Sequence, residues 1–144
     1  MSKVNVVFWS QSGNTESMAN AVAAGVTAAG KEANVVFVAD ASIDELKNAK
    51  AFALGCPAMG AEVLEEAEME PFVSDLEGFV SGKTIGLFGS YGWGDGQWMR
   101  DWVDRMTAAG ATVVGGEGVM CQDAPDGAAE EACKELGRAL AAAI

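Results

Sequence analysis

Strand-like and helix-like segments alternate strictly along this chain, and that order restricts its possible folds more than any other feature. Short runs of β-branched and aromatic residues, apolar on both faces, are each followed by a stretch that suits a helix. Five such pairs predict one doubly wound parallel sheet of five strands, with helices on both faces. We therefore expect a single α/β domain over residues 1–144, because this length leaves no room for a second domain.

Glycines and helix-capping residues set the expected boundaries. Strands are expected at 4–9, 35–38, 51–55, 84–90 and 111–120. Helices are expected at 14–29, after the capping-box pair Ser42 and Glu45, at 97–109 and at 127–143. A further helix is expected to have Pro71 in its first turn and to reach about Glu77. Within the last strand, Gly115 and Gly116 predict a bulge.

The chain is strongly acidic, with 21 Asp and Glu residues against 9 Lys and Arg and a net charge of −12. Nucleic acids and anionic membranes are therefore unsuitable partners, whereas a basic protein surface is a suitable one. The sequence contains no histidine, which excludes Ser-His-Asp and Cys-His catalysis and His-ligated metal sites.

Three scattered cysteines are too few for an iron–sulfur cluster or a disulfide framework, and free thiols suit a reducing compartment. No apolar stretch reaches the length of a membrane span, and no cleavage site follows the first residues. We expect a cytoplasmic protein that has no metal centre and does not contact a membrane.

In an open parallel sheet, ligands bind beyond the carboxyl ends of the strands. Here the loops at 10–15, 56–62, 90–97 and 120–126 lie there. The first, Ser10-Gln11-Ser12-Gly13-Asn14-Thr15, brings hydroxyls and a glycine to a helix N-terminus, where backbone N–H groups favour a phosphate. It lacks the lysine of a nucleotide-hydrolysing P-loop, so it would hold a phosphate without activating it. Plain helix capping would use the same residues.

Two further loops carry groups that suit a flat ligand. Trp93 sits between glycines and off any helical stripe, so its indole could stack on a ring or fold back onto its own loop. By contrast, Trp98, Trp102 and Met106 follow a four-residue spacing and are expected in the core. The third loop, Cys56-Pro57-Ala58-Met59-Gly60-Ala61-Glu62, offers a polarisable thioether, a glycine peptide free to rotate and a carboxylate that could accept from a ring N–H. Core packing for Met59 and a solvated position for Glu62 are the plainer alternatives.

Two other site chemistries do not fit these loops. A tyrosine phosphatase would need an arginine soon after Cys56, but the next basic residue is Lys83. A receiver domain would need a pair of acids after the first strand, where this chain has Ser10-Gln11-Ser12.

Taken together, the loops resemble those of the short-chain flavodoxin family. The segment 10–15 resembles its phosphate loop, the segment 55–62 its first flavin loop and the segment 89–96 its second. Each motif alone is modest, but three of them in register at the ends of the first, third and fourth strands are specific. The resemblance implies the strand order 2-1-3-4-5 and FMN bound non-covalently at the switch point, for which flavodoxin is the known example.

The resemblance also implies roles for individual residues. Trp93 would stack on the outer face of the flavin ring and Met59 would cover the inner face. The Gly60 carbonyl would face flavin N5 when that atom is protonated, and Glu62 would accept from N3–H. The remaining expected contacts are made by Ser10, Gln11, Ser12, Gly13, Asn14 and Thr15 at the phosphate, by Pro57, Ala58, Ser90, Tyr91, Gly92 and Gly94 in the flavin loops, and by the backbone of Cys121 and Gln122 at the pyrimidine edge.

Two positions depart from the family pattern. Gln11 stands where relatives often have glycine, and its side chain can point outward. Pro57 stands where many relatives have a hydroxyl residue, which removes one possible phosphate contact that Ser90 could replace.

The function implied is that of a one-electron carrier cycling mainly between neutral semiquinone and hydroquinone. A Gly60 carbonyl bonded to N5–H would favour the semiquinone alone. Seven acids and no base lie between Lys50 and Lys83, and negative surroundings disfavour an anionic hydroquinone, which predicts a low potential. The expected protein is a monomer without catalytic residues that serves basic-surfaced redox proteins such as reductases and ferredoxin-dependent enzymes. An FMN-dependent quinone or nitro reductase and a module that has lost its cofactor are the alternatives.

Overall fold

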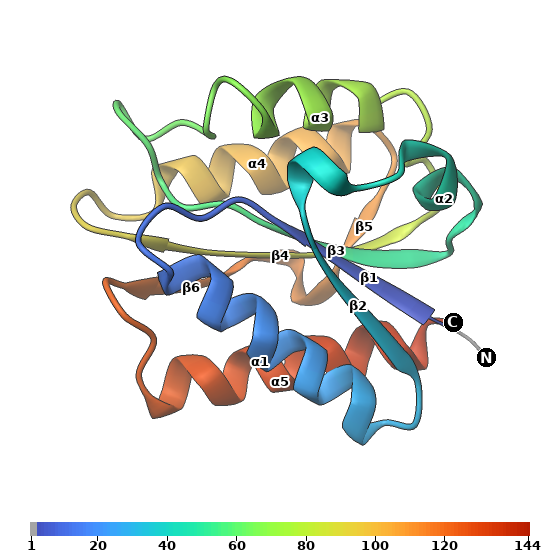
Figure 1. Cartoon of the computed structure of the whole chain (residues 1–144). Helices are drawn as coiled ribbons and strands as arrows, with labels where there is room; N and C mark the ends of the chain where they lie inside the picture. The colour runs from blue at the N-terminus through green and yellow to red at the C-terminus, as the bar shows by residue number, and fades with distance from the viewer. Residues whose placement is uncertain (1–2) are drawn as a thin grey trace.

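The computed structural model describes residues 3–144, which form one parallel sheet between two layers of helices (Figure 1). The strands run in the order β2-β1-β3-β4-β5, with β6 pairing with β4, and this confirms the expected order. Their bounds are β1 Lys3–Phe8, β2 Glu32–Phe37, β3 Ala51–Gly55, β4 Thr84–Tyr91, β5 Thr112–Val113 and β6 Val119–Gln122.

The helices lie on both faces of this sheet, as the alternating sequence predicts. One layer contains α1 (Asn14–Ala28) and α5 (Gly127–Ala142), and the other contains α2 (Ile43–Asn48), α3 (Met69–Leu76) and α4 (Gln97–Ala108) (Figure 1). Each layer has its own core, because alternate residues of a central strand point to opposite faces. Val4, Val6 and Phe8 join the α1–α5 core, whereas Val7 joins the core under α3 and α4.

Sequence and structure agree at several particular residues. Trp98, Trp102 and Met106 are buried in the core, as their spacing predicts. The Ser42 hydroxyl accepts from the backbone N–H of Glu45 at 3.2 Å, which confirms the helix start expected there.

Helices α1 and α5 approach each other closely at two glycines. A Cβ on Gly25 would lie 2.0 Å from the carbonyl oxygen of Lys134, and one on Gly137 would lie 2.0 Å from that of Val22. Only a residue without a side chain allows backbone contact this close. The pair of glycines therefore sets the distance between the two helices that close this face of the sheet.

The last strand differs from the expectation. Residues 111–120 do not form one strand with a bulge, because a 3-10 turn, η2 (Val114–Gly116), separates β5 from β6. Gly115 and Gly116 both have positive φ, at 72° and 75°, and two such residues in succession turn the chain out of an extended path. The chain then rejoins β4 at its carboxyl end, where β6 pairs with residues Phe88–Tyr91.

Smaller differences occur at element ends. The second strand begins at Glu32 and ends at Phe37, before the short 3-10 helix η1 (Val38–Asp40). The third helix spans Met69–Leu76, and Pro71 lies in its first turn as expected. Among residues 3–144, no helix combines the length and apolar character needed to cross a bilayer.

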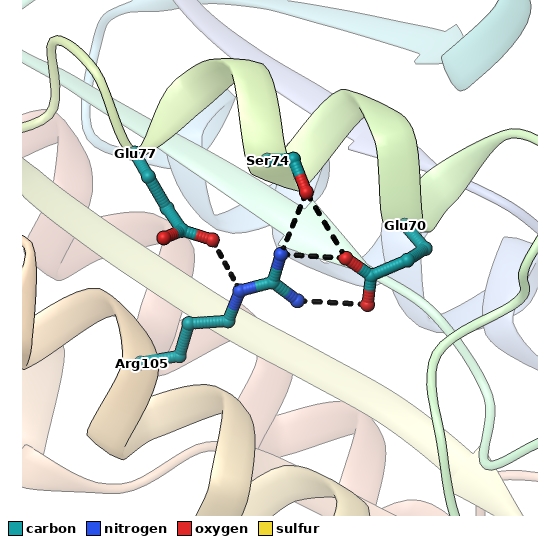
Figure 2. Close-up of polar contacts among 4 residues, drawn as sticks. All are labelled: Glu70, Ser74, Glu77 and Arg105. Carbon is teal, nitrogen blue, oxygen red and sulfur yellow. Dashed lines mark hydrogen bonds and ion pairs between the residues drawn. The ribbon is translucent and has the colours of Figure 1, made fainter.

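Arg105 fastens α3 to α4 on the outer face (Figure 2). Its guanidinium donates to both carboxylate oxygens of Glu70, at 2.8 and 2.6 Å, and to the Ser74 hydroxyl at 3.0 Å. Its Nε donates to Glu77 at 2.5 Å. Bonding to Arg105 lowers the pKa of Glu70 in spite of its partial burial. We call this group of bonds between Arg105 and Glu70, Ser74 and Glu77 the Arg105 clamp. It holds α3 in place, and thereby the end of the connection that runs from β3 to α3.

Candidate functional site

Loops from four strands meet at the carboxyl edge of the sheet, on the left in Figure 1. We name three of them by position: the first loop (residues 10–15), the Met59 loop (residues 56–63) and the Trp93 loop (residues 91–96). The fourth follows β6. This is the edge at which open parallel sheets bind their ligands.

The first loop presents backbone N–H groups at the start of α1. Gly13 is the N-cap, with φ of 94°, and as a glycine it has no side chain to make a capping bond. The Ser10 hydroxyl lies inside the loop and accepts from the N–H groups of Gly13 and Glu16, at 3.2 and 3.3 Å. Among the described residues, no protein acceptor pairs with the N–H groups of Asn14 and Thr15. A helix N-terminus with such free donors binds anions.

A buried hydroxyl pair joins the first loop to the end of β4. Thr15 Oγ1 and Ser90 Oγ lie 3.1 Å apart, although the residues are 75 positions apart in sequence. Both residues are buried, at 1% and 5% exposure. The end of β4 and the first loop are therefore joined directly beneath the site loops.

A cavity of about 320 Å³ opens between these loops. Nine of the expected site residues line it: Gln11, Ser12, Asn14, Pro57, Ala58, Met59, Ser90, Tyr91 and Gly92. Its size lies at the lower end of the range for small-molecule sites. The structure thus brings together three loops that the sequence singled out separately.

The Met59 loop is a tight reversal held by its own backbone. Met59 and Val63 exchange two N–H···O=C bonds, each 2.9 Å long. Between them Gly60 and Glu62 have positive φ, at 50° and 57°. A Cβ on Gly60 would meet no atom within 4 Å, so the space beside this residue is open.

The side chain of Glu62 lies against the Trp93 loop. One carboxylate oxygen accepts from the backbone N–H of Gln97, the first residue of α4, at 3.2 Å. A Cβ on Gly94, whose φ is 86°, would lie 2.4 Å from that oxygen. Glu62 is half-buried, and its carboxylate caps a helix that follows another loop.

The aromatic residues of the Trp93 loop occupy different positions. Tyr91 lines the cavity and packs on Trp98 with ring centroids 5.6 Å apart. Trp93 is 64% exposed and is not one of the described residues that line the cavity. Its indole is therefore largely in solvent instead of folded back into its own loop.

The loop after β6 adds a residue that sequence reasoning missed. Asp123 lines the cavity, with φ of 59°, and its N–H donates to the carbonyl of Tyr91 at 2.8 Å. An aspartate just beyond a strand tolerates this left-handed conformation, which was the available signal. Of the two residues expected here, Gln122 donates to the Gly92 carbonyl at 3.4 Å, and the Cys121 thiol lies 3.5 Å from the sulfur of Met18.

The cysteine nearest the cavity is chemically inert. Burial raises the pKa of the Cys56 thiol to about 12, so it stays protonated and is a poor nucleophile. Among residues 3–144, no group of three or more His, Cys, Asp or Glu side chains could hold a metal ion.

These groups fit FMN. Uncharged donors at the start of α1 suit a phosphate, while Met59, Ala58 and Tyr91 supply the apolar and aromatic surface that a flat ring requires.

Comparison with known proteins agrees with this fit. The model of the family described as Flavodoxin matches residues 6–137. A flavodoxin from Clostridium beijerinckii is 49% identical over 138 residues, covering 96% of this chain and 99% of the relative. A flavodoxin from Megasphaera elsdenii is 48% identical over 140 residues, covering 97% and 99%.

Solved structures agree as well. The solution structure of two-electron reduced Megasphaera elsdenii flavodoxin covers 97% of this chain and 99% of its own, with a TM-score of 0.86 and 47% identity. A flavodoxin from the domain Archaea reaches the same TM-score at 31% identity, covering 97% and 96%. This chain therefore belongs to the flavodoxin family, whose members bind FMN and transfer electrons instead of acting as enzymes.

Proposed function

We propose that this carrier, a single domain over residues 1–144, holds FMN in the cavity between the first loop and the Met59 loop. The N–H groups of Asn14 and Thr15 and the hydroxyls of Ser10, Ser12 and Thr15 bind the phosphate. Met59 covers one face of the ring and Trp93 stacks on the other. The observation that carries this proposal is the cavity itself, which joins helix-start donors to an apolar slot.

Trp93 must change position to stack. Its exposed indole is followed by Gly94, which has positive φ. The two ends of the loop are held by hydrogen bonds, Tyr91 to Asp123 and Gln97 to Glu62. The indole can therefore swing toward the cavity while the loop ends stay in place. In this proposal Tyr91 supplies the inner wall and Trp93 closes the outer one.

FMN, when bound, accepts and releases electrons one at a time, and the protein sets the energy of each step. Gly60 supplies a carbonyl that can turn toward a newly protonated ring nitrogen, because no side chain opposes rotation of its peptide. Such a bond contributes about 0.5–1.5 kcal/mol net and favours the half-reduced carrier.

The acids near the cavity favour a low second potential. Glu62 and Asp123 lie on the site loops. The two basic side chains of α4 are already bound to acids, Arg100 to Asp95 and Arg105 to Glu70 and Glu77. Negative surroundings raise the energy of an added negative charge. We therefore propose that the carrier works mainly between its half-reduced and fully reduced forms.

The same charge distribution suits basic redox partners such as reductases and ferredoxin-dependent enzymes. Electron-transfer encounters of this kind are weak and depend on complementary charge, so their rates fall as salt rises. Three free cysteines support a reducing, cytoplasmic setting, and we propose that the protein acts as a monomer.

A ligand comparison tests the site. The apoprotein is titrated with FMN and with riboflavin, and quenching of flavin fluorescence gives both dissociation constants. We expect FMN to bind at least about tenfold more tightly, a factor worth about 1.4 kcal/mol, because only FMN has the phosphate. Equal affinities would remove the first loop from the site.

Two serine variants locate the phosphate. Ser12→Ala removes a hydroxyl that lines the cavity, whereas Ser17→Ala removes an exposed hydroxyl one turn further along α1. The first should weaken FMN binding and spare riboflavin, and the second should change neither. Weaker riboflavin binding to Ser12→Ala would indicate a damaged loop and count against a phosphate role.

A further inference from the structure

Glu65 is a buried carboxylate that binds three backbone N–H groups. Its oxygens accept from Ala67 at 2.8 Å, from Glu68 at 2.7 Å and from Met69 at 2.9 Å. The residue is only 8% exposed. Burial alone would raise the pKa of Glu65, but the three N–H bonds outweigh it and the pKa falls. The carboxylate is therefore charged at neutral pH and fully engaged.

This carboxylate replaces an N-cap for α3. Glu68 stands at the N-cap position, and its own side chain makes no capping bond. The Glu68 side chain instead accepts from the indole N–H of Trp9, just after β1, at 3.2 Å. Glu65, which follows the Met59 loop, is therefore bonded to the start of α3. Arg105 in turn holds α3 against α4.

The backbone of Glu65 closes that loop at its base. Its N–H donates to the sulfur of Cys56 at 3.4 Å. Cys56 is itself fixed, because its N–H donates to the carbonyl of Phe88 at 3.1 Å and its carbonyl accepts from the indole of Trp98 at 3.1 Å. Residues 56 and 65 are therefore joined, and the segment between them is held at both ends.

The tip of the Met59 loop has few anchors of its own. The Met59–Val63 bond pair lies within the loop and does not fix it to the rest of the protein. Outside the base, the backbone bond from Ala58 to the carbonyl of Ser90 and the Glu62–Gln97 bond hold it. Gly60 and Ala61 at the tip are exposed, as is Val63 beside it. The direction of the tip therefore depends strongly on where its base is held.

We infer that Glu65 is a positioning residue, which directs Met59 and Gly60 toward the ring of bound FMN although it does not line the cavity itself. This inference rests on the proposed function of the Met59 loop. According to this inference, three hydrogen bonds outside the cavity, between Glu65 and the start of α3, determine the orientation of the Met59 loop.

Glutamine is the informative replacement. Glu65→Gln keeps the size of the side chain but turns one acceptor into an NH₂ donor facing backbone N–H groups, so buried donors lose their partner. Glu66→Gln is the matched control. Glu66 is adjacent and exposed, its side chain makes no hydrogen bond among the described residues, and its replacement removes the same charge.

The first measurement needs no cofactor. Amide hydrogen exchange is followed in the apoproteins of the wild type and both variants. In Glu65→Gln we expect faster exchange at Met59 and Val63 as well as at Ala67, Glu68 and Met69, with the wild-type pattern kept in Glu66→Gln. Faster exchange at the start of α3 alone would show a purely local cap and overturn the inference.

The second measurement uses FMN. Its dissociation constant should rise about tenfold in Glu65→Gln, equivalent to about 1.4 kcal/mol, and change little in Glu66→Gln. The first one-electron potential should fall in Glu65→Gln, because a misplaced Gly60 carbonyl would no longer stabilise the half-reduced carrier. It should not change in Glu66→Gln, because this step adds an electron together with a proton and is insensitive to a lost surface charge. Equal shifts in both variants would mean that Glu65 acts only through its charge.

Wild-type behaviour separates this inference from the proposed function. If the wild type fails to bind FMN, the proposed function fails. If the wild type binds FMN and Glu65→Gln binds it equally well, only the positioning role fails. Should Glu65→Gln not fold, the wild-type apoprotein still decides, because joint exchange of the Val63 and Met69 amides supports the inference and independent exchange contradicts it.

Discussion

The carboxylate of Glu62, in the Met59 loop, accepts a hydrogen bond from the backbone N–H of Gln97 at the start of α4. The bond connects the two loops proposed to enclose the flavin ring. A carboxylate has two oxygens, so one can cap α4 while the other remains able to accept a further bond. The two walls of the site are thereby coupled before any ligand arrives.

Removing the Glu62 carboxylate should loosen α4 as well as the site. Glu62→Ala is expected to cost about 1 kcal/mol of unfolding free energy, as the loss of a helix cap does. Glu62→Gln keeps an acceptor and should cost less. Urea unfolding of the apoproteins measures both, and equal stability of wild type and Glu62→Ala would show that the bond contributes nothing.

Gly94 permits this contact and provides a test of it. In Gly94→Ala the new Cβ occupies the place of the Glu62 oxygen, and the positive φ adds strain of about 1–2 kcal/mol. Glu62→Ala should then have little further effect in the Gly94→Ala background. Additive costs in this double-mutant cycle would mean that the two residues do not interact.

Gly60 should control how much half-reduced protein accumulates. Gly60→Val places a β-branched side chain at φ of 50° and opposes rotation of the peptide. Ala61→Val, one residue further on, is the control. Absorbance during gradual reduction should show less half-reduced carrier in Gly60→Val only, and unchanged accumulation would contradict the proposed carbonyl switch.

The Arg105 clamp predicts a stability effect that depends on pH. The folded-state pKa of Glu70 is lowered, so its contribution is complete above the unfolded pKa and disappears as pH falls through the folded value. Because the side chain of Glu70 is 41% exposed, we expect at most about 1 kcal/mol. Arg105→Met should be less stable than wild type near about pH 7 and should approach it near about pH 2. A difference that is constant across this range would assign the loss to packing.

The α1–α5 contact predicts a steric penalty at Gly137. Gly137→Ala pushes a methyl group into the carbonyl of Val22 and should cost about 1–3 kcal/mol. Gly127→Ala, at the open start of α5, should be neutral or slightly stabilising, since a Cβ there meets no atom within 4 Å. Thermal unfolding of the two variants provides the comparison.

The sequence predicted the features that depend on periodicity and local chemistry. Apolar runs such as Val4–Trp9 and the helix signals at Ser42 and Gly30 were sufficient for the sheet, its helices and the loops at its edge. The prediction of a bulge at Gly115 and Gly116 is wrong. A glycine pair is compatible with a bulge and with a 3-10 turn, and only the pairing of β6 with β4 distinguishes the two. Element ends moved by one to three residues for similar reasons.

The site was less predictable than the fold. The individual loops carry recognisable residues, but their contacts with other segments are not visible in the sequence. The Glu62–Gln97 bond and the Thr15–Ser90 pair join segments far apart in the chain. The carboxylate of Glu65 instead turns back to bind three N–H groups of its own segment. No local pattern encodes such contacts. Glu65 in particular is one of the seven acids between Lys50 and Lys83, and nothing local in the sequence marks it as the buried one.

Stepwise reduction of the FMN-loaded protein, followed by absorbance, tests the central claim most directly. The account predicts two well-separated one-electron steps, with nearly all of the protein passing through a half-reduced form that carries a protonated ring nitrogen. A single two-electron step, or protein that takes up no FMN, would contradict it.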